Sequence, residues 1–179
     1  MKQYKTILVK GRGFMHNSYQ GPAIRPFARI LLNTQPTARA SVRGDAKHRS
    51  IRGTVNIYPV PGGSLVTAEI HGLPQNSKSG IFAMHIHEGG FCTGNQADPF
   101  ADTGGHYNPD NKPHPLHAGD LPPLFSNNGF AYYCFYTNRF TPAEVTGRTV
   151  VIHSDPDDFR TQPAGASGSK IACGAIRKA

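Results

Sequence analysis

Six histidines and Asp120, all within residues 85–153, are the part of this 179-residue sequence that could do chemistry. They are His85, His87, His106, His114, His117, Asp120 and His153. A lone histidine is usually an ordinary polar residue, but six in one window would each need a separate structural reason. Imidazole and carboxylate groups are common metal ligands, so the cluster predicts metal binding. His16, His48 and His71 lie outside the cluster and are expected to be surface residues.

Three of these histidines belong to segments with the alternating pattern of β-strands. In residues 81–87, alternation places Phe82, Met84 and Ile86 on one face and the two imidazoles of His85 and His87 together on the other. A second such segment, residues 149–153, ends in His153. Two imidazoles at neighbouring same-face positions with a third from elsewhere suit copper, which accepts nitrogen ligands in a near-planar arrangement.

The other ligand candidates lie in a loop-like run that ends at Asp120. His106, His114, His117 and Asp120 make a complete tetrahedral nitrogen and oxygen set of the kind that closes structural zinc sites. The residues are therefore compatible with two metal sites of different type.

The elements that must position these residues are short strands. The chain contains 20 Gly and 15 Pro, which leave little room for long helices, and its length suits one ordinary domain. Apolar alternation between turn residues predicts seven or eight strands in one antiparallel sandwich or barrel. The predicted segments are residues 39–42, 51–58, 64–70, 81–87, 130–136, 149–153 and 170–176.

The predicted loop from Glu88 to Asn128 is much longer than the usual connection inside a compact domain. A loop of this length is either disordered or fixed by additional bonds. Because it contains Cys92 and four of the candidate metal ligands, we expect metals or a disulfide to hold it in place.

The positive charge lies away from this cluster. The net charge is +8, but residues 1–52 hold 11 Lys and Arg against one acid, and residues 53–179 hold 8 against 10. We therefore divide the chain into a basic N-terminal extension of unknown role, residues 1–35, and a metal-binding domain, residues 36–179. No apolar stretch suits a membrane span or the centre of a secretory leader, so the expected location is cytoplasmic or cell-associated.

Several motifs together resemble the copper/zinc superoxide dismutase family, and in particular its bacterial branch. They are His85-Ile86-His87, Gly105-His106-Tyr107-Asn108-Pro109, His117-Ala118-Gly119-Asp120-Leu121-Pro122, Gly147-Arg148-Thr149-Val150-Val151-Ile152-His153 and Ala172-Cys173-Gly174. The resemblance runs from about Ala38 to the end of the chain, in the family's motif order. It implies an all-β fold, an eight-stranded antiparallel Greek-key barrel or sandwich with long metal-binding loops.

The resemblance also implies a role for each candidate ligand. His85, His87 and His153 correspond to copper ligands, His106 to an imidazolate that bridges copper and zinc, and His114, His117 and Asp120 to the remaining zinc ligands. Asp157 matches a carboxylate that in the family links a copper-ligand histidine, here His85, to a zinc-ligand histidine, here His114. Such a carboxylate would fix the tautomers and orientation of both rings.

Expectations also follow for four further residues, the three cysteines and Lys170. Cys92 and Cys173 match the family's disulfide, and Cys134 is then expected to be a small buried hydrophobic residue. Lys170 stands where the family usually has the arginine that guides superoxide to copper. Lysine keeps the charge but lacks the planar fork of arginine, which predicts reduced turnover.

The implied activity is conversion of superoxide to dioxygen and hydrogen peroxide by copper redox cycling, with zinc in a structural and tuning role. In the family, the histidine at the position of His106 delivers a proton to the departing peroxide. A non-catalytic copper-binding or copper-buffering protein on the same fold is the first alternative. A second treats the basic third as a nucleic-acid or surface-binding arm. We expect superoxide as the substrate, a monomer or homodimer, and no nucleic-acid partner.

Overall fold

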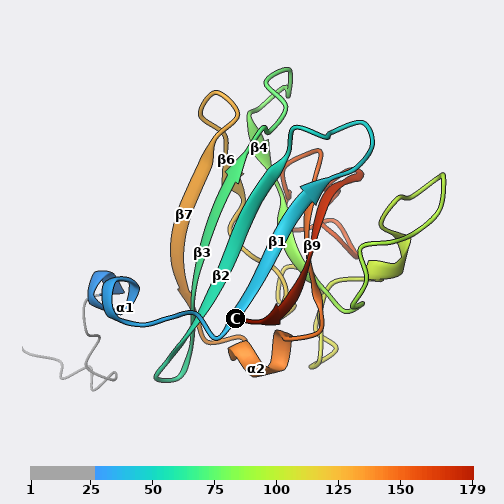
Figure 1. The fold of residues 1–179 in the computed structure, drawn as a ribbon. Coiled ribbons are helices and arrows are strands. Elements are labelled where there is room, and N and C mark those ends of the chain that lie inside the picture. Colours follow the sequence, from blue (N-terminus) through green and yellow to red (C-terminus); the bar gives the residue numbers. More distant parts are fainter. Residues whose placement is uncertain (1–26) are drawn as a thin grey trace, which may run out of the picture.

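The computed structural model describes residues 27–179, which form an all-β fold (Figure 1). Seven strands make one curled sheet in the order β5-β8-β9-β1-β2-β3-β7, and β4 pairs with β6 beside it. Every pairing is antiparallel. The strands are β1 (Ala38–Gly44), β2 (Arg52–Val60), β3 (Gly63–His71), β4 (Ile81–Phe82), β5 (Met84–His87), β6 (Leu124–Phe125), β7 (Ala131–Thr137), β8 (Thr149–His153) and β9 (Lys170–Lys178). The helices are α1 (Phe27–Asn33), the single 3-10 turn η1 (Ala101–Thr103) and α2 (Pro142–Val145).

The core lies on the concave side of the curled sheet. Alternation along β1 buries Ala38, Ala40 and Val42 completely and leaves the residues between them exposed. β5 and β8 are buried on both faces, because one face packs into this core and the other faces the long loops. The strands that carry His85, His87 and His153 are therefore the most enclosed part of the sheet.

The all-β prediction is confirmed, and each of the seven predicted segments contains a strand. Residues 81–87 form two strands because Ala83 leaves the ladder and bonds through its N–H to the carbonyl oxygen of Asp155. β6 lies inside the segment predicted to be a loop, and its two residues are too few to produce a periodic pattern. The boundary at residue 35 stays a prediction, since most of the proposed extension lies outside the described residues.

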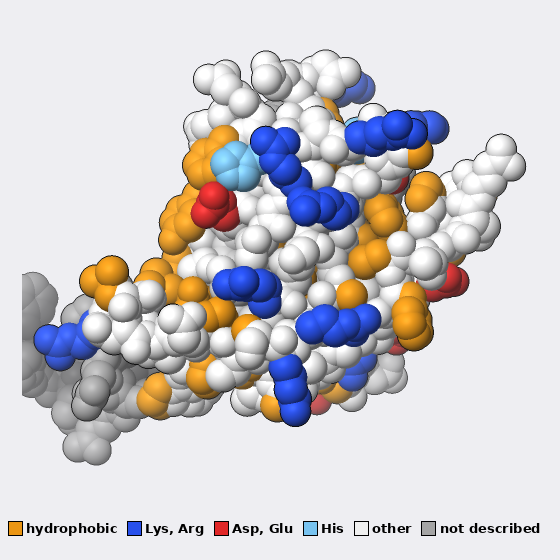
Figure 2. Space-filling view, viewed as in Figure 1, with side chains coloured by type: hydrophobic (Ala, Val, Ile, Leu, Met, Phe, Trp, Pro, Cys, Tyr) orange, Lys and Arg blue, Asp and Glu red, His pale blue; other side chains and the backbone are white. Residues whose placement is uncertain are grey.

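The convex face of the sheet carries much of the basic charge. Lys and Arg side chains spread over the surface formed by β1, β2 and β9, and hydrophobic side chains gather toward β3 and β7 (Figure 2). Among residues 27–179, no helix is long and apolar enough to cross a bilayer.

The expectation that Cys134 is buried is wrong. Cys134 is an exposed free thiol on β7, the edge strand of the sheet. The strand register turns Tyr133 and Phe135 toward the core, so the residue between them points outward. Apolar neighbours along a strand do not establish burial: residues 130–136 are all apolar, but β7 is covered on only one face.

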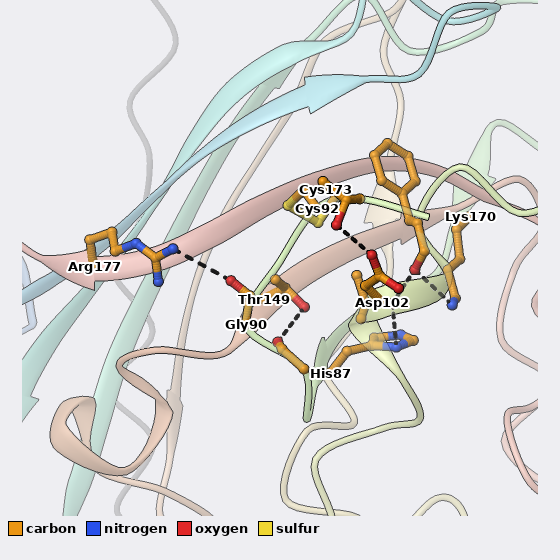
Figure 3. The surroundings of a disulfide bond; sticks show 12 residues. His87, Gly90, Cys92, Asp102, Thr149, Lys170, Cys173 and Arg177 are labelled. Carbon is orange, nitrogen blue, oxygen red and sulfur yellow. Dashed lines mark hydrogen bonds between the residues drawn. A yellow bond between two sulfur atoms is a disulfide. The ribbon is translucent and has the colours of Figure 1, made fainter. Parts of the chain in front are cut away.

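The predicted disulfide joins Cys92 and Cys173, which are 81 residues apart in the sequence. Figure 3 shows the bond where the loop after β5 crosses β9. Phe100 and Val151 pack with the two cysteines in a small second apolar cluster. The bond therefore fixes the first part of the long loop against the sheet.

We expect Cys92→Ser to lower the free energy of unfolding by about 2–4 kcal/mol, because the unfolded chain would regain the freedom that the closed loop removes. Urea unfolding of the variant and the parent protein measures this difference. Cys134→Ser is the matched control and should change stability little. Equal effects of the two substitutions would contradict the structural role of the disulfide.

Candidate metal centre

Four histidines from different elements meet in a first set, which we call set A: His85, His87, His106 and His153. Each offers one ring nitrogen, and these nitrogens lie within 4.8 Å of one another. Pairing of β5 with β8 places His85 opposite Val151 and His87 opposite Thr149, and His153 ends β8 at the point where its register with β9 shifts. His106 joins them through an isolated bridge to His87. All four side chains are buried.

Hydrogen bonds determine which nitrogens of set A face the centre. The Nδ1–H group of His87 donates a hydrogen bond to the carbonyl oxygen of Gly104 at 2.9 Å, which leaves Nε2 as the nitrogen without a proton. That Nε2 atom lies 3.2 Å from Nε2 of His153. The Nδ1 atom of His85 and the Nε2 atom of His106 are buried without a hydrogen-bond partner. Two of the four inward nitrogens of set A therefore have no hydrogen-bond partner in the protein, and the other two lie only against each other.

A second set, set B, consists of His106, His114, His117 and Asp120, with donor atoms again within 4.8 Å of one another. The Nδ1 atom of His106 lies 2.8 Å from Oδ1 of Asp120 and 3.4 Å from Nδ1 of His117. The Nδ1 atom of His114 has no hydrogen-bond partner, although it lies 3.2 Å from Oδ2 of Asp120. Three imidazoles and one carboxylate in this space match a closed tetrahedral zinc site.

His106 belongs to both sets. Its Nδ1 atom faces Asp120 and His117 in set B, and its Nε2 atom is the unpartnered nitrogen of set A. An imidazole that offers both ring nitrogens to metals must lose its ring proton, and two nearby positive ions favour that form. The position of this ring is the feature that joins the two sets into one centre.

Asp157 connects the two sets through their outer ring nitrogens. Its Oδ2 atom accepts a hydrogen bond from Nε2 of His85 at 2.8 Å, and its Oδ1 atom accepts one from Nε2 of His114 at 2.9 Å. The backbone N–H of Phe159 also donates to Oδ1, at 2.6 Å. Protonation at both Nε2 atoms leaves each Nδ1 atom free for a metal. The sequence-predicted link between His85 and His114 is thus present in the geometry.

Gly165 shapes this link, and no sequence motif indicated it. The residue has a positive φ of 67°, and a side chain there would overlap Oδ1 of Asp157 and crowd Nε2 of His114. Only glycine lets the backbone approach the carboxylate so closely.

The electrostatics of the centre favour neutral imidazoles and ionised carboxylates. Burial lowers the pKa of His153 to about 3, with further lowering by the nearby rings of His85 and His106. Burial also lowers the pKa of His85 and, more strongly, that of His87. Burial alone would raise the pKa of Asp157, but the hydrogen bonds it accepts, first that from His85, lower it to about 2. Neutral nitrogen and anionic oxygen are the forms that bind metals.

These observations fit a copper ion in set A and a zinc ion in set B. A native protein rarely leaves a buried polar atom without a partner, and here three unpartnered ring nitrogens lie on His85, His106 and His114. All the donors are nitrogen or oxygen, as zinc and copper(II) accept.

A cavity of about 670 Å³ opens beside set A, and His87, His106 and His153 line it together with Lys170 and Asp98. The Nζ atom of Lys170 donates to Oδ2 of Asp98 at 2.9 Å and to the carbonyl oxygen of Phe100 at 3.1 Å. The contact lowers the pKa of Asp98, although burial opposes that change. Lys170 therefore lies where the resemblance predicts a cation, but it is paired with Asp98, an anion to which no sequence motif pointed.

We expect Asp157→Asn to weaken metal binding at both sets by about 10–100-fold, the usual effect of losing a group that orients metal-ligating histidines. Asn cannot accept a hydrogen bond from each ring on a separate oxygen, because one of its two terminal groups is a donor. Competition with a coloured chelator measures both affinities. Gly165→Ala displaces the same carboxylate without changing its charge and should weaken both sites in the same direction. Loss at only one site would contradict the bridging role.

We expect the metal-free protein to lose stability as the pH falls from about 6.5 toward 3. The folded-state pKa values of His153, His87 and His85 lie below the unfolded value, so the unfolded chain binds more protons in this range. The free energy of unfolding therefore rises with pH and is fully regained above about 6.5. Urea unfolding at several pH values measures it, and a flat profile between neutral pH and pH 4 would refute this account.

Comparison with known proteins agrees with this geometry. Residues 51–176 match the family model described as copper/zinc superoxide dismutase (SODC). The chain is 36% identical over 161 residues to a superoxide dismutase [Cu-Zn] of Deinococcus radiodurans, covering 80% of this chain and 85% of that one. It is 34% identical over 140 residues to superoxide dismutase [Cu-Zn] 2 of Aquifex aeolicus, covering 70% and 78%.

A solved structure is similar as well. The Cu/Zn superoxide dismutase from Brucella abortus superposes with a TM-score of 0.66 at 27% identity, covering 77% of this chain and 98% of that one. The family match extends over most of the described residues and includes every member of sets A and B. The chain belongs to the copper/zinc superoxide dismutase family.

Proposed function

We propose that this protein converts two superoxide anions and two protons into dioxygen and hydrogen peroxide. Set A would hold copper and set B would hold zinc. The observation that carries the proposal is the shared ring of His106, whose two nitrogens face the two sets. A copper ion would supply one-electron chemistry, oxidising one superoxide and reducing the next, and the protein residues would bind the anion and pass on protons taken from water.

His106 is suited to move a proton. Its Nε2 atom is buried among the ring nitrogens of set A, and the residue also lines the cavity from which superoxide would enter. The Nδ1 atom stays beside Asp120, so the ring keeps its orientation whether or not Nε2 carries a proton. His106 would therefore take a proton at Nε2 and give it to the peroxide that leaves.

Lys170 supplies the positive charge nearest to the cavity, but that charge is partly cancelled. Its side chain is 16% exposed, and Asp98, which pairs with it, is 39% exposed. A paired ammonium attracts an anion less strongly than a free one, since the dipole of a close ion pair falls off faster with distance than a single charge. This pairing, in addition to the loss of the arginine fork, supports the expectation of reduced turnover.

The same pair favours the second candidate function, a copper-binding or copper-buffering protein on this fold. A buffer needs the ligands of set A but no guidance of superoxide. The complete second set and the position of His106 between the two sets support catalysis over buffering.

Assembly and location are also part of the proposal. We propose a monomer or homodimer without a nucleic-acid partner, with a cytoplasmic or cell-associated location. Size-exclusion chromatography with light scattering measures the assembly, and fractionation of the cells measures the location.

The experiment that tests the function measures copper content, zinc content and superoxide removal on one preparation. We expect one copper and one zinc per chain, with activity that follows the copper content. His106→Ala should keep much of the fold but remove nearly all activity. Two bound metals without superoxide removal would favour the buffering function, and zinc alone would contradict the role of set A.

We expect Asp98→Asn to raise the rate of superoxide removal by about two- to tenfold at low ionic strength, because it frees the charge of Lys170 to attract the anion. The gain should shrink as salt is added. Lys170→Gln should lower the rate and flatten its salt dependence. Binding of azide to the copper(II) protein offers a second readout, and it should tighten in Asp98→Asn. An unchanged rate and azide affinity would contradict the proposed role of this pair.

A further inference from the structure

Four arginines lie on the convex face of the sheet, away from sets A and B. They are Arg39 and Arg43 on β1, Arg52 on β2 and Arg177 on β9, and all four are exposed. We call this surface the arginine face. It is visible in Figure 2 as the basic side chains spread over β1, β2 and β9.

The strand register places these arginines in like-charged pairs. Arg43 lies directly opposite Arg52 in the pairing of β1 with β2, and Arg39 lies directly opposite Arg177 in the pairing of β1 with β9. Like charges directly across a sheet repel and are destabilising. Two such pairs on one face therefore lower stability unless an anion lies against them.

The described part of the chain provides no carboxylate within ion-pair distance of these four side chains. Arg39 donates to the amide oxygen of Asn56 at 2.8 Å, and Arg177 donates to the carbonyl oxygen of Gly90 at 3.4 Å. Both acceptors are neutral, so the positive charges remain. Glu69, on the neighbouring β3, is bound to His71 at 3.1 Å.

One of the two pairs borders a small hollow suited to a phosphate group. Arg43, Arg52 and His71 line this hollow of about 260 Å³ together with the hydroxyls of Ser41 and Thr54. Guanidinium groups and hydroxyls are the usual donors to phosphate oxygens. Glu69 also lines it and would oppose an anion, but the two guanidinium groups outnumber it.

Exposed aromatic side chains continue the same face beyond the hollow. The ring of His71 lies 4.8 Å from the ring of Phe130, and the register of β3 with β7 places Tyr132 and Tyr136 on the same side of the sheet. Phe130, Tyr132 and Tyr136 are 39%, 55% and 42% exposed. Exposed aromatic side chains are enriched at membrane interfaces, where the apolar acyl chains meet the polar headgroups.

We propose that the arginine face docks this protein on an anionic phospholipid surface, with lipid phosphates against the two arginine pairs and the aromatic rings at the headgroup level. The two pairs are about 14 Å apart along β1, since Arg43 lies four positions after Arg39 on this strand. The four arginines are spread over three neighbouring strands, so they could each contact a different headgroup in a lipid layer. Duplex DNA fits less well, because neither a helix nor a β-ribbon projects from the described part of this face toward a groove.

The test uses the full chain, loaded with copper and zinc, in sedimentation with phosphatidylcholine vesicles that contain or lack phosphatidylglycerol. We expect binding only with phosphatidylglycerol, and we expect salt to weaken it. Arg43→Gln and Arg52→Gln should each reduce the affinity about fivefold, and together about 25-fold. Lys78→Gln, which removes one exposed charge from a loop, is the matched control and should cause a clearly smaller loss.

Three outcomes would overturn the proposal. An equal loss of vesicle affinity in Arg43→Gln and Lys78→Gln would show that the vesicles attract the net charge of the protein and not the arginine face. Full vesicle binding by the double variant would indicate that residues 1–26, which hold five Lys and Arg and no acid, bind the vesicles instead of the arginine face. Binding to duplex DNA at protein concentrations that leave the vesicles free would indicate a nucleic-acid partner. Unchanged metal content and thermal unfolding of each variant establish that it is folded.

Discussion

The rest of the structure depends on the burial of six imidazoles around two aspartates. Burial lowers the pKa of His85, His87 and His153 and keeps these three rings neutral, and hydrogen bonds determine which nitrogen of His85 and of His87 faces inward. Asp157 sets this choice for His85 and His114 together. Without a metal, the arrangement leaves unpartnered nitrogens in a buried space, which costs free energy. Other interactions in the fold must therefore stabilise the protein enough to offset this cost.

The sheet and the disulfide provide this stabilisation. β5 and β8 are enclosed on both faces, so the strands that carry His85, His87 and His153 cannot move independently of the core. The bond between Cys92 and Cys173 fixes one end of the long loop, and the bridge between His87 and His106 fixes the next part. The loop is therefore ordered by the same groups that could hold the metals, which explains how it can be so long.

The sequence was sufficient to predict what depends on residue type and short spacing. Strand alternation placed His85 and His87 on one face, and the family motifs indicated the link from Asp157 to both sets. It could not predict what depends on contacts distant in the sequence. Asp98 is separated from Lys170 by 72 residues, and Gly165 matters only because Asp157 folds back against it. Cys134 was misjudged because an apolar run does not reveal that its strand lies at an edge.

The central claim is that His106 belongs to both metal sites, and magnetic coupling tests it most directly. The protein would be loaded with copper(II) in set A and cobalt(II) in set B, and its electron paramagnetic resonance spectrum compared with that of the protein holding copper(II) alone. The account predicts that the copper(II) signal is lost when cobalt(II) is added, because the shared imidazole couples the two ions. A copper(II) signal of full intensity with both metals bound would contradict it.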